Sequence, residues 1–498
     1  MQAADHSATT GRTGKYPKGL FFLFATEMWE RFSFYGISAV LVLYLTTRLG
    51  LPDREAALAS GAYLAFTFMS PILGGFVADK VLGLRYSVSV GGVLILTGNL
   101  ILAWREALLP VFTGLACVAL GTGFLKSTVS VMVGKLYAEG DTHRDSGYTL
   151  FYMGINAGAL LAGVSMAWVA KTYGWHNCFY LSSAGMLLGL VVFQLGYPHY
   201  RNEADGFQRE NLFKRPLGLP NIAWLIAGTL GLGAVMVHLF QNPGQTRLVI
   251  TYLSFGIIVG IFLLGYLCKD RKERHSIFAI LIIILAAICF QSFFKQLYNS
   301  LTLFADRDFD RVLFGIQLEA SFFSLVPNSV AVIALAGVFT WMWAKLADAG
   351  RNPSIPMKIV FAMFFAVASS ALLAWVAGGI AASGQKASAW WIVLAITILT
   401  LGELNILPMG LSAVSTLAPK RYASLLMGSW FLCNSLGGYL SGFFTSLASV
   451  DRERVADVAY TATVYRSLYA TCAAGLAVVA VIMLLITPPV KRLMATRD

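Results

Sequence analysis

The sequence predicts an all-α protein that crosses a membrane many times. Three observations predict it: the composition, the spacing of apolar segments and the placement of basic residues. Of the 498 residues, 57% are hydrophobic and only 12% are charged, and the mean hydropathy is +0.69. Soluble domains carry about a quarter charged residues, so the composition excludes a soluble protein. The six cysteines are scattered, mostly within apolar segments, and are interpreted as packing residues.

Fourteen apolar segments are long enough to cross a bilayer, which takes about twenty residues. The first six lie at 20–48, 55–78, 86–104, 108–137, 146–170 and 175–197. Two more lie at 219–240 and 248–268, flanked by basic loops at 198–218 and 269–275. The last six lie at 276–305, 315–345, 357–382, 388–418, 422–448 and 462–487.

The placement of lysine and arginine supports this arrangement. With both chain ends inside, the inner loops and tails carry about twice as many basic residues as the outer loops, as the positive-inside rule requires. The net charge of +12 is therefore interpreted as loops that face anionic lipid, and not as a nucleic-acid surface. Three basic residues, Arg31, Lys126 and Lys295, fall inside predicted spans.

A repeated turn predicts two related six-helix halves. "GGFVADKVLGLR" (74–85) and "WAKLADAGRN" (343–352) both carry Ala-Asp, then Gly, then a basic residue. Internal repeats of this kind are typical of transporters. The expected organisation is a cytoplasmic tail at 1–19, a six-helix bundle at 20–197, linkers with two inserted helices at 198–275, a second six-helix bundle at 276–488 and a cytoplasmic tail at 489–498.

The charges inside the spans are the first candidates for a functional site, because such charges are costly and usually mark a pathway. Glu27, Glu30 and Arg31 share a face of the first helix. Lys126 lies at a similar depth, and Glu403 supplies an acid from the second half. Two cations opposite one acid would suit a small zwitterion. The alternative is that these charges pair with one another and hold the helices together.

Polar neighbours and a proton complete this interpretation. Asn156 and Asn328 are expected beside the zwitterion as hydrogen-bonding groups. Glu27 and Glu30 also suggest a transported proton. No histidine lies in the middle of a candidate pore helix, so the proton carrier is expected to be a carboxylate.

Several motifs carry a resemblance to a known family. "EMWERFSFYG" (27–36) resembles the first-helix signature of the proton-coupled oligopeptide transporter (POT) family, within the major facilitator superfamily. The segments "GGFVADKVLG" (74–83), "GTGFLKSTVSVMVGKLY" (121–137), "FYMGINAGA" (151–159) and "GELNILPMGLSAVSTLAP" (402–419) resemble further motifs of that family, in the same order. The resemblance spans essentially the whole chain, including the two inserted helices of bacterial members.

The resemblance implies twelve core helices in two bundles, alternating access, and proton-driven uptake of di- and tripeptides. By position, Arg31 and Lys126 resemble the residues that hold the peptide carboxylate, and Glu403 resembles the acid that meets the amino terminus. Glu27 and Glu30 resemble the proton-linked acids, to which Arg31 and Lys126 are coupled.

Four further residues take roles from the same resemblance. Asn156 and Asn328 resemble the amides that flank the peptide. Trp430 matches an aromatic position that lines the cavity, and Tyr152 lies near the peptide-binding region of the family. As an aromatic residue in a helix, Tyr152 could equally be a packing residue.

Five positions depart from the family pattern: Phe34, Ser38, Phe68, Lys295 and Leu407. Their lost polar groups predict a more apolar pocket. Ser38 stands where the family has an arginine that pairs with an acid of the seventh core helix at the outer gate, and Lys295 stands at that acid's position. We therefore expect Lys295 to supply the lost gating cation, towards Glu319. The alternative is a solvated lysine at the edge of the pore.

Two other functions stay open: a carrier of another small anion or zwitterion on the same fold, and a sensor that binds without transport. An enzyme is not expected, because no nucleophile–base pair, metal cluster or phosphate-binding loop stands out in the sequence. The expected partners are small peptides, protons and membrane lipid, with no cofactor besides the proton, no nucleic acid and a monomeric chain. The expected location is the bacterial inner membrane, with both termini cytoplasmic.

Overall fold

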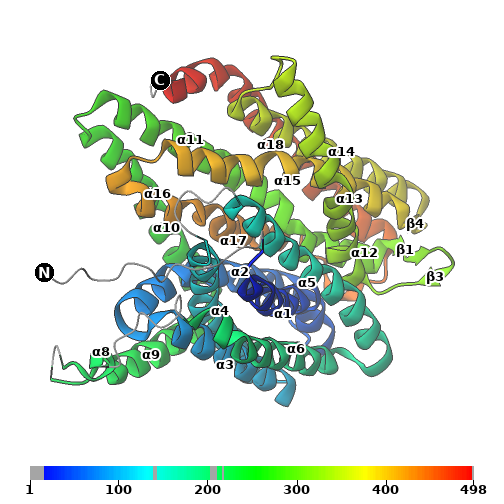
Figure 1. Ribbon diagram of the computed structural model, residues 1–498. Helices are drawn as coiled ribbons and strands as arrows, with labels where there is room; N and C mark the ends of the chain where they lie inside the picture. Colours follow the sequence, from blue (N-terminus) through cyan, green and yellow to red (C-terminus); the bar gives the residue numbers. More distant parts are fainter. Residues whose placement is uncertain (1–15, 138–142, 202–209, 216–217, 496–498) are drawn as a thin grey trace, which may run out of the picture.

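The computed structural model describes residues 16–137, 143–201, 210–215 and 218–495. The chain is almost entirely helical in these residues (Figure 1). Two short π-helical turns, Tyr44–Arg48 and Ala78–Leu82, follow the first and second helices. The first group of helices is α1 (Lys18–Leu43), α2 (Asp53–Val77), α3 (Gly83–Trp104), α4 (Leu108–Lys135), α5 (Arg144–Tyr173) and α6 (Trp175–Gly196).

A connecting segment and a second group of helices follow. The segment holds a short helix and two long ones, α8 (Glu210–Phe213), α9 (Asn221–Gln241) and α10 (Pro243–Leu267). The second group is α11 (Arg271–Phe294), α12 (Ser300–Asp308), α13 (Ala320–Asp348), α14 (Ile355–Ser383), α15 (Trp390–Leu417), α16 (Ala423–Trp430), α17 (Leu432–Leu447) and α18 (Val458–Ala495).

Four two-residue strands lie in the connections of the second group. Strand β1 (Phe309–Asp310) pairs in parallel with β4 (Ala387–Ser388). Strands β2 (Val312–Leu313) and β3 (Ile316–Gln317) form an antiparallel hairpin. Its two turn residues, Phe314 and Gly315, have φ values of 51° and 77°, which fits the positive φ that a two-residue type I′ turn needs at both positions.

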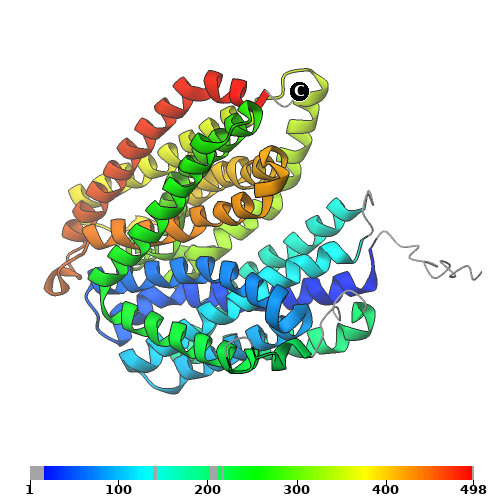
Figure 2. The same cartoon turned by 90° about the vertical axis from the view of Figure 1, so that its left-hand side faces the viewer.

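The helices pack as two groups, which Figure 2 shows one above the other. In the first group, α1 packs against α5 and α6, and α3 packs against α4. In the second, α14 packs against α15 and α18, and α11 packs against α17. Helix α9 packs on α4 and α10 packs on α11, so the inserted helices contact both groups. The predicted domain ends at 19, 197, 275 and 488 stay a prediction.

The two groups meet at the end that holds the α1–α2 turn, which is predicted to face outward. Helix α2 packs on α17 and α5 packs on α13. Glycine makes the first contact possible: a Cβ on Gly442 would lie 2.3 Å from the carbonyl oxygen of Ala57. Small residues allow helix backbones this close an approach. The buried residues of α13 all lie within Ala320–Val332, so its second half does not take part in the closed interface.

Two segments predicted as single helices are interrupted. The segment 276–305 breaks at the 3₁₀ turn Lys295–Tyr298, between α11 and α12. The segment 422–448 breaks at Phe431, where the backbone N–H of Asn434 bonds to the carbonyl of Phe431, three residues earlier. Such i→i+3 bonds tighten a helix locally.

Eleven helical stretches among the described residues are long and apolar enough to cross a membrane. One of them, Asp53–Trp104, contains both α2 and α3. The first helix is not among the eleven, since its charged residues lower its hydropathy. The predicted count of fourteen spans therefore stays a prediction, whereas the many apolar helices agree with an integral membrane protein.

Candidate functional site

A cavity between the two groups of helices contains most of the charges that the sequence placed inside spans. Its lining comes from α1, α2, α4 and α5 on one side and from α11, α13, α15 and α17 on the other. The sequence-predicted residues that line it are Arg31, Lys126, Tyr152, Asn156, Lys295, Asn328 and Glu403. The tertiary structure therefore brings together residues that are up to 372 positions apart along the chain.

The first group contributes two cations, and each is paired with an acid of α1. The Arg31 guanidinium donates to the carboxylate of Glu30, with Nη2 to Oε1 at 2.5 Å, and a second bond joins Nε to Oε2. Lys126 Nζ donates to Glu27 Oε1 at 2.5 Å, and Arg31 Nε lies 3.6 Å from the same oxygen. Both glutamates are 0% exposed. Buried charges of this kind are stable only when paired.

These contacts support part of the alternative in which the charges pair with one another and hold the helices together. The charges of α1 and α4 do pair with one another. However, Arg31 and Lys126 also line the cavity, and Lys126 remains one-fifth exposed. A ligand that enters the cavity therefore reaches the two cations directly, and reaches Glu27 and Glu30 only through them.

The second group contributes one acid held by an amide. Asn328 Nδ2 donates to Glu403 Oε2 at 2.8 Å and to Thr400 Oγ1 at 2.9 Å. Asn328 is on α13, and Glu403 and Thr400 are on α15. Both helices contain a proline close to these residues, Pro327 and Pro408. The hydrogen bonds orient the Glu403 carboxylate at the cavity, opposite the cations of the first group.

Lys295 lies in the cavity without an acidic partner among the described residues. Its Nζ is 5.0 Å from the ring centre of Phe68, 5.6 Å from that of Phe294 and 5.4 Å from that of Tyr298. An ammonium group is attracted to such aromatic faces. The expected pairing with Glu319 is not formed in this structure: Glu319, at the start of α13, has its carboxylate 3.7 Å from Arg311 Nη1. A gating role for Lys295 stays a prediction.

Four predicted residues lie outside the cavity lining: Glu27 and Glu30, which pair with its cations, and Ser38 and Trp430. Ser38 is buried, and its hydroxyl donates to the carbonyl of Phe34 on its own helix at 2.8 Å. Trp430 is buried against α15, where a Cβ on Gly410 would lie 2.0 Å from its ring. Neither Ser38 nor Trp430 is among the residues that line the cavity. Asn156 does line the cavity, and its Nδ2 donates to the carbonyl of Tyr152 at 3.3 Å.

Some of the residues that depart from the family pattern line the cavity, and others do not. Phe68 and Leu407 line the cavity, and a pocket more apolar than that of the family stays a prediction. Phe34 lies behind it, with the Arg31 guanidinium 4.7 Å from its ring centre. The residues that the sequence analysis missed are Tyr35, Ile155, Ala159, Gln291, Phe294, Tyr298, Leu325, Ser329 and Asn434. Helical spacing could have found Gln291, which precedes Lys295 by four positions on the same face.

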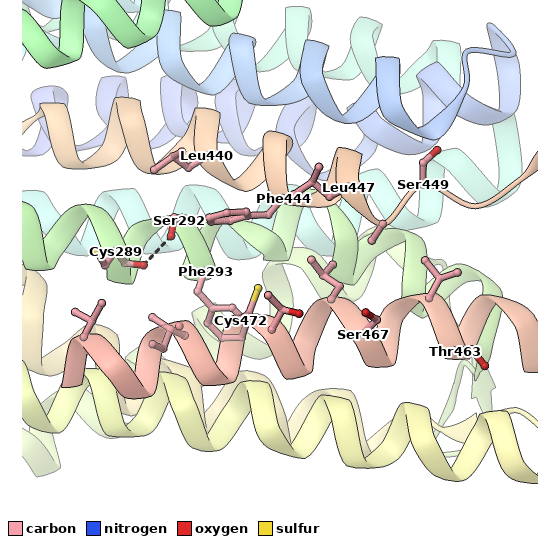
Figure 3. A pocket seen from close by; sticks show the side chains of 17 residues that line it. Cys289, Ser292, Phe293, Leu440, Phe444, Leu447, Ser449, Thr463, Ser467 and Cys472 are labelled. Carbon is pink, nitrogen blue, oxygen red and sulfur yellow. Dashed lines mark hydrogen bonds between the residues drawn. The ribbon is translucent and has the colours of Figure 1, made fainter. Parts of the chain in front are cut away.

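A larger cavity of about 740 Å³ lies elsewhere, between α11, α17 and α18 (Figure 3). Its lining is apolar apart from small hydroxyls and thiols, and none of the described residues that line it is charged. The charged cavity is the better candidate site, since a polar ligand needs convergent polar groups and not only volume.

Comparison with known proteins defines the class of protein. The model of the POT family matches residues 86–461, and the chain belongs to this family. It is a membrane transporter and not an enzyme. The match begins after "EMWERFSFYG", so the first-helix motif is independent of it.

Individual relatives cover nearly the whole chain. The peptide transporter YePEPT of Yersinia enterocolitica is 32% identical, over 96% of this chain and 95% of the relative. Dipeptide and tripeptide permease A of Escherichia coli is 28% identical, over 96% of this chain and 94% of the relative.

Solved structures share the fold. A crystal structure of a POT peptide transporter in complex with sulfate has a TM-score of 0.82 and 32% identity, covering 96% of both chains. A POT family transporter in complex with 5-aminolevulinic acid has a TM-score of 0.81 and 26% identity, covering 95% of this chain and 97% of that one. The predicted fold class, an all-α membrane protein of the major facilitator type, is confirmed.

Proposed function

We propose that the chain is a proton-coupled symporter that imports di- and tripeptides by alternating access. The observation that carries the proposal is the charge arrangement of the cavity. Two cations of the first group, Arg31 and Lys126, face the cavity opposite the acid Glu403 of the second group. Relatives named as peptide transporters and as dipeptide and tripeptide permeases support the same substrate class.

The proposed substrate pose follows from charge. The peptide carboxylate binds Arg31 and Lys126, and the peptide ammonium group binds Glu403. Asn156 and Asn328 lie beside these groups and supply hydrogen bonds. Because each half of the protein holds one end of the peptide, binding favours a conformation in which the halves approach each other around it.

Proton coupling follows from competition for the cations. A peptide carboxylate at Arg31 and Lys126 competes with Glu27 and Glu30, which pair with those cations. Once the peptide neutralises the cations, a proton neutralises the displaced acids, since a buried charge is stable only when paired. Substrate binding and protonation of the α1 acids would then favour each other, with no cofactor other than the proton.

The energy available to such a symporter is substantial. One charge crossing 100 mV is worth ~2.3 kcal/mol, and one pH unit adds ~1.4 kcal/mol. With one proton per peptide, the total of roughly 3.7 kcal/mol would support several-hundredfold accumulation. The same proposal includes a monomer in the bacterial inner membrane, surrounded by lipid, with both termini cytoplasmic, as the distribution of Lys and Arg suggests.

The test is uptake of a labelled dipeptide into liposomes that contain the purified protein. An inward proton gradient and an inside-negative potential are imposed, and Glu30→Gln is measured in parallel. Gradient-dependent accumulation that the variant loses is the expected result. Binding without uptake would instead favour a sensor, and neither binding nor uptake of peptides would favour a carrier of another small anion or zwitterion.

A further inference from the structure

The side chain of Gln291 is a buried polar group of the cavity that the proposed pose does not use. It belongs to α11, one turn before Lys295, and it lines the cavity. The residue is 1% exposed. Within the described part of the chain, neither its Nε2 nor its Oε1 has a hydrogen-bond partner.

An unsatisfied buried amide needs an explanation, because buried polar groups are almost always hydrogen-bonded and leaving one unpaired is costly. The Nδ2 atoms of two neighbouring amides of the cavity have partners: that of Asn328 donates to Glu403 and Thr400, and that of Asn156 donates to the carbonyl of Tyr152. Gln291 differs from them because its Nε2 donor, as well as its Oε1 acceptor, has no partner among the described residues.

Packing holds the Gln291 backbone close to α17. A Cβ on Gly437 would lie 2.5 Å from the Cβ of Gln291 and 3.0 Å from its carbonyl carbon. The Cβ of Gln291 is therefore packed directly against α17, which fixes the base of the side chain at the edge of the cavity. The adjacent Ser292 shows the opposite case: its hydroxyl donates to the carbonyl of Cys289 at 2.8 Å and lines the apolar cavity of Figure 3.

We infer that Gln291 is a substrate-binding residue that hydrogen-bonds the peptide group of the transported peptide. The inference rests on the proposed function and adds a recognition site for the middle of the substrate. Arg31 and Lys126 would hold one end of the peptide and Glu403 the other, so the peptide bond lies between them. A carboxamide suits this position, since it can donate to the peptide carbonyl or accept from the peptide N–H.

The test compares a dipeptide with its ester analogue, in which an oxygen replaces the peptide N–H. The ester loses the donor and has a weaker carbonyl acceptor, so it probes either hydrogen bond. Competition binding to the detergent-purified full chain is measured for the wild type, Gln291→Met and Ser292→Ala. The wild type is expected to bind the amide about tenfold more tightly than the ester, as one net hydrogen bond predicts.

The variants distinguish binding from packing. Gln291→Met is expected to bind the amide about tenfold more weakly than the wild type and to bind amide and ester equally. Its melting temperature should be unchanged or higher, because it replaces an unpaired buried amide by an apolar side chain of similar size. Ser292→Ala should keep the wild-type ratio, since its hydroxyl is satisfied within α11.

Each failure has a separate meaning. Equal binding of amide and ester by the wild type overturns the role of Gln291, and this measurement needs no variant to fold. An unchanged amide-to-ester ratio in Gln291→Met overturns it as well. If the wild type binds neither compound nor any other dipeptide, the proposed peptide transport itself is wrong.

Discussion

The ion pair between Asp53 and Arg307 is expected to hold the two groups of helices together at the outer end. Asp53 begins α2, and Arg307 lies near the end of α12. The pair is bidentate, with Nη1 to Oδ2 at 2.6 Å and Nη2 to Oδ1 at 2.7 Å, and each side chain is 7% exposed. The N–H of Val450 also donates to Asp53 Oδ2 at 3.2 Å, and Arg307 Nη1 donates to Tyr465 Oη at 3.1 Å.

The magnitude follows from burial. Removal of one partner leaves the other charge buried and unpaired, which costs about 3–5 kcal/mol. A cost confined to the outward-closed conformation changes the ratio of closed to open molecules on the order of 10²–10⁴-fold. Replacing both partners by apolar residues of similar volume leaves no unpaired charge and is often nearly neutral. Each of the single variants Asp53→Leu and Arg307→Met should therefore favour opening of the outer end. The double variant should favour opening less than either single variant does.

The assay is a distance measurement between spin labels at Glu55 and Glu453, which are exposed at the outer end on opposite groups. Each single variant should gain a longer-distance population, and the double variant should return towards the wild-type distribution. The two single changes and the double change form a cycle that isolates the coupling between the partners. If both single variants keep the wild-type distances and melting temperature, the pair does not stabilise the closed end.

Two further predictions test the cavity and the helix contact. Glu403→Gln should weaken binding of a dipeptide by roughly 10- to 100-fold, since a hydrogen bond to a charged group is lost. In a competition assay, an N-acetylated dipeptide, which has no ammonium group, should bind the wild type and the variant equally. An equal loss of affinity for both ligands would contradict the role assigned to Glu403. Gly442→Ala should destabilise the contact between α17 and α2 by about 1–3 kcal/mol, because the added Cβ would meet the backbone of α2. Thermal unfolding compares this variant with Gly428→Ala, whose added Cβ meets nothing within 4 Å. Equal melting temperatures of the two variants would argue against close packing at Gly442.

The charged residues of the cavity were predictable from sequence because each is conspicuous by itself. Arg31, Lys126 and Glu403 stand out as charges in apolar segments, and all three line the cavity. Asn156 and Asn328 were expected as hydrogen-bonding groups beside the zwitterion, and both lie there as well. A charge in a span needs a polar surrounding wherever the helices pack, so its presence in the site does not depend on the details of packing.

Other residues could not be placed in this way. Ser38 and Trp430 stand at positions that have assigned roles in the family, yet Ser38 bonds within its own helix and Trp430 packs on Gly410. Lys295 was expected to meet Glu319, but Arg311 lies beside that carboxylate. Gln291 was overlooked because a single glutamine in an apolar helix carries no charge and no motif. In each case the partner is set by helix rotation and crossing, which residues far along the chain decide.

The sequence by itself determined the all-α membrane architecture, the approximate helix positions and the charges that define the cavity, because hydropathy and burial cost act locally along the chain. The tertiary structure alone decided which acid neutralises which cation, where α11 and α16 end, and which polar groups face the cavity unpaired. Those outcomes depend on contacts of a few ångströms between helices, such as the approach of Gly442 to α2 and of Gly437 to α11, and close packing transmits such contacts across the bundle.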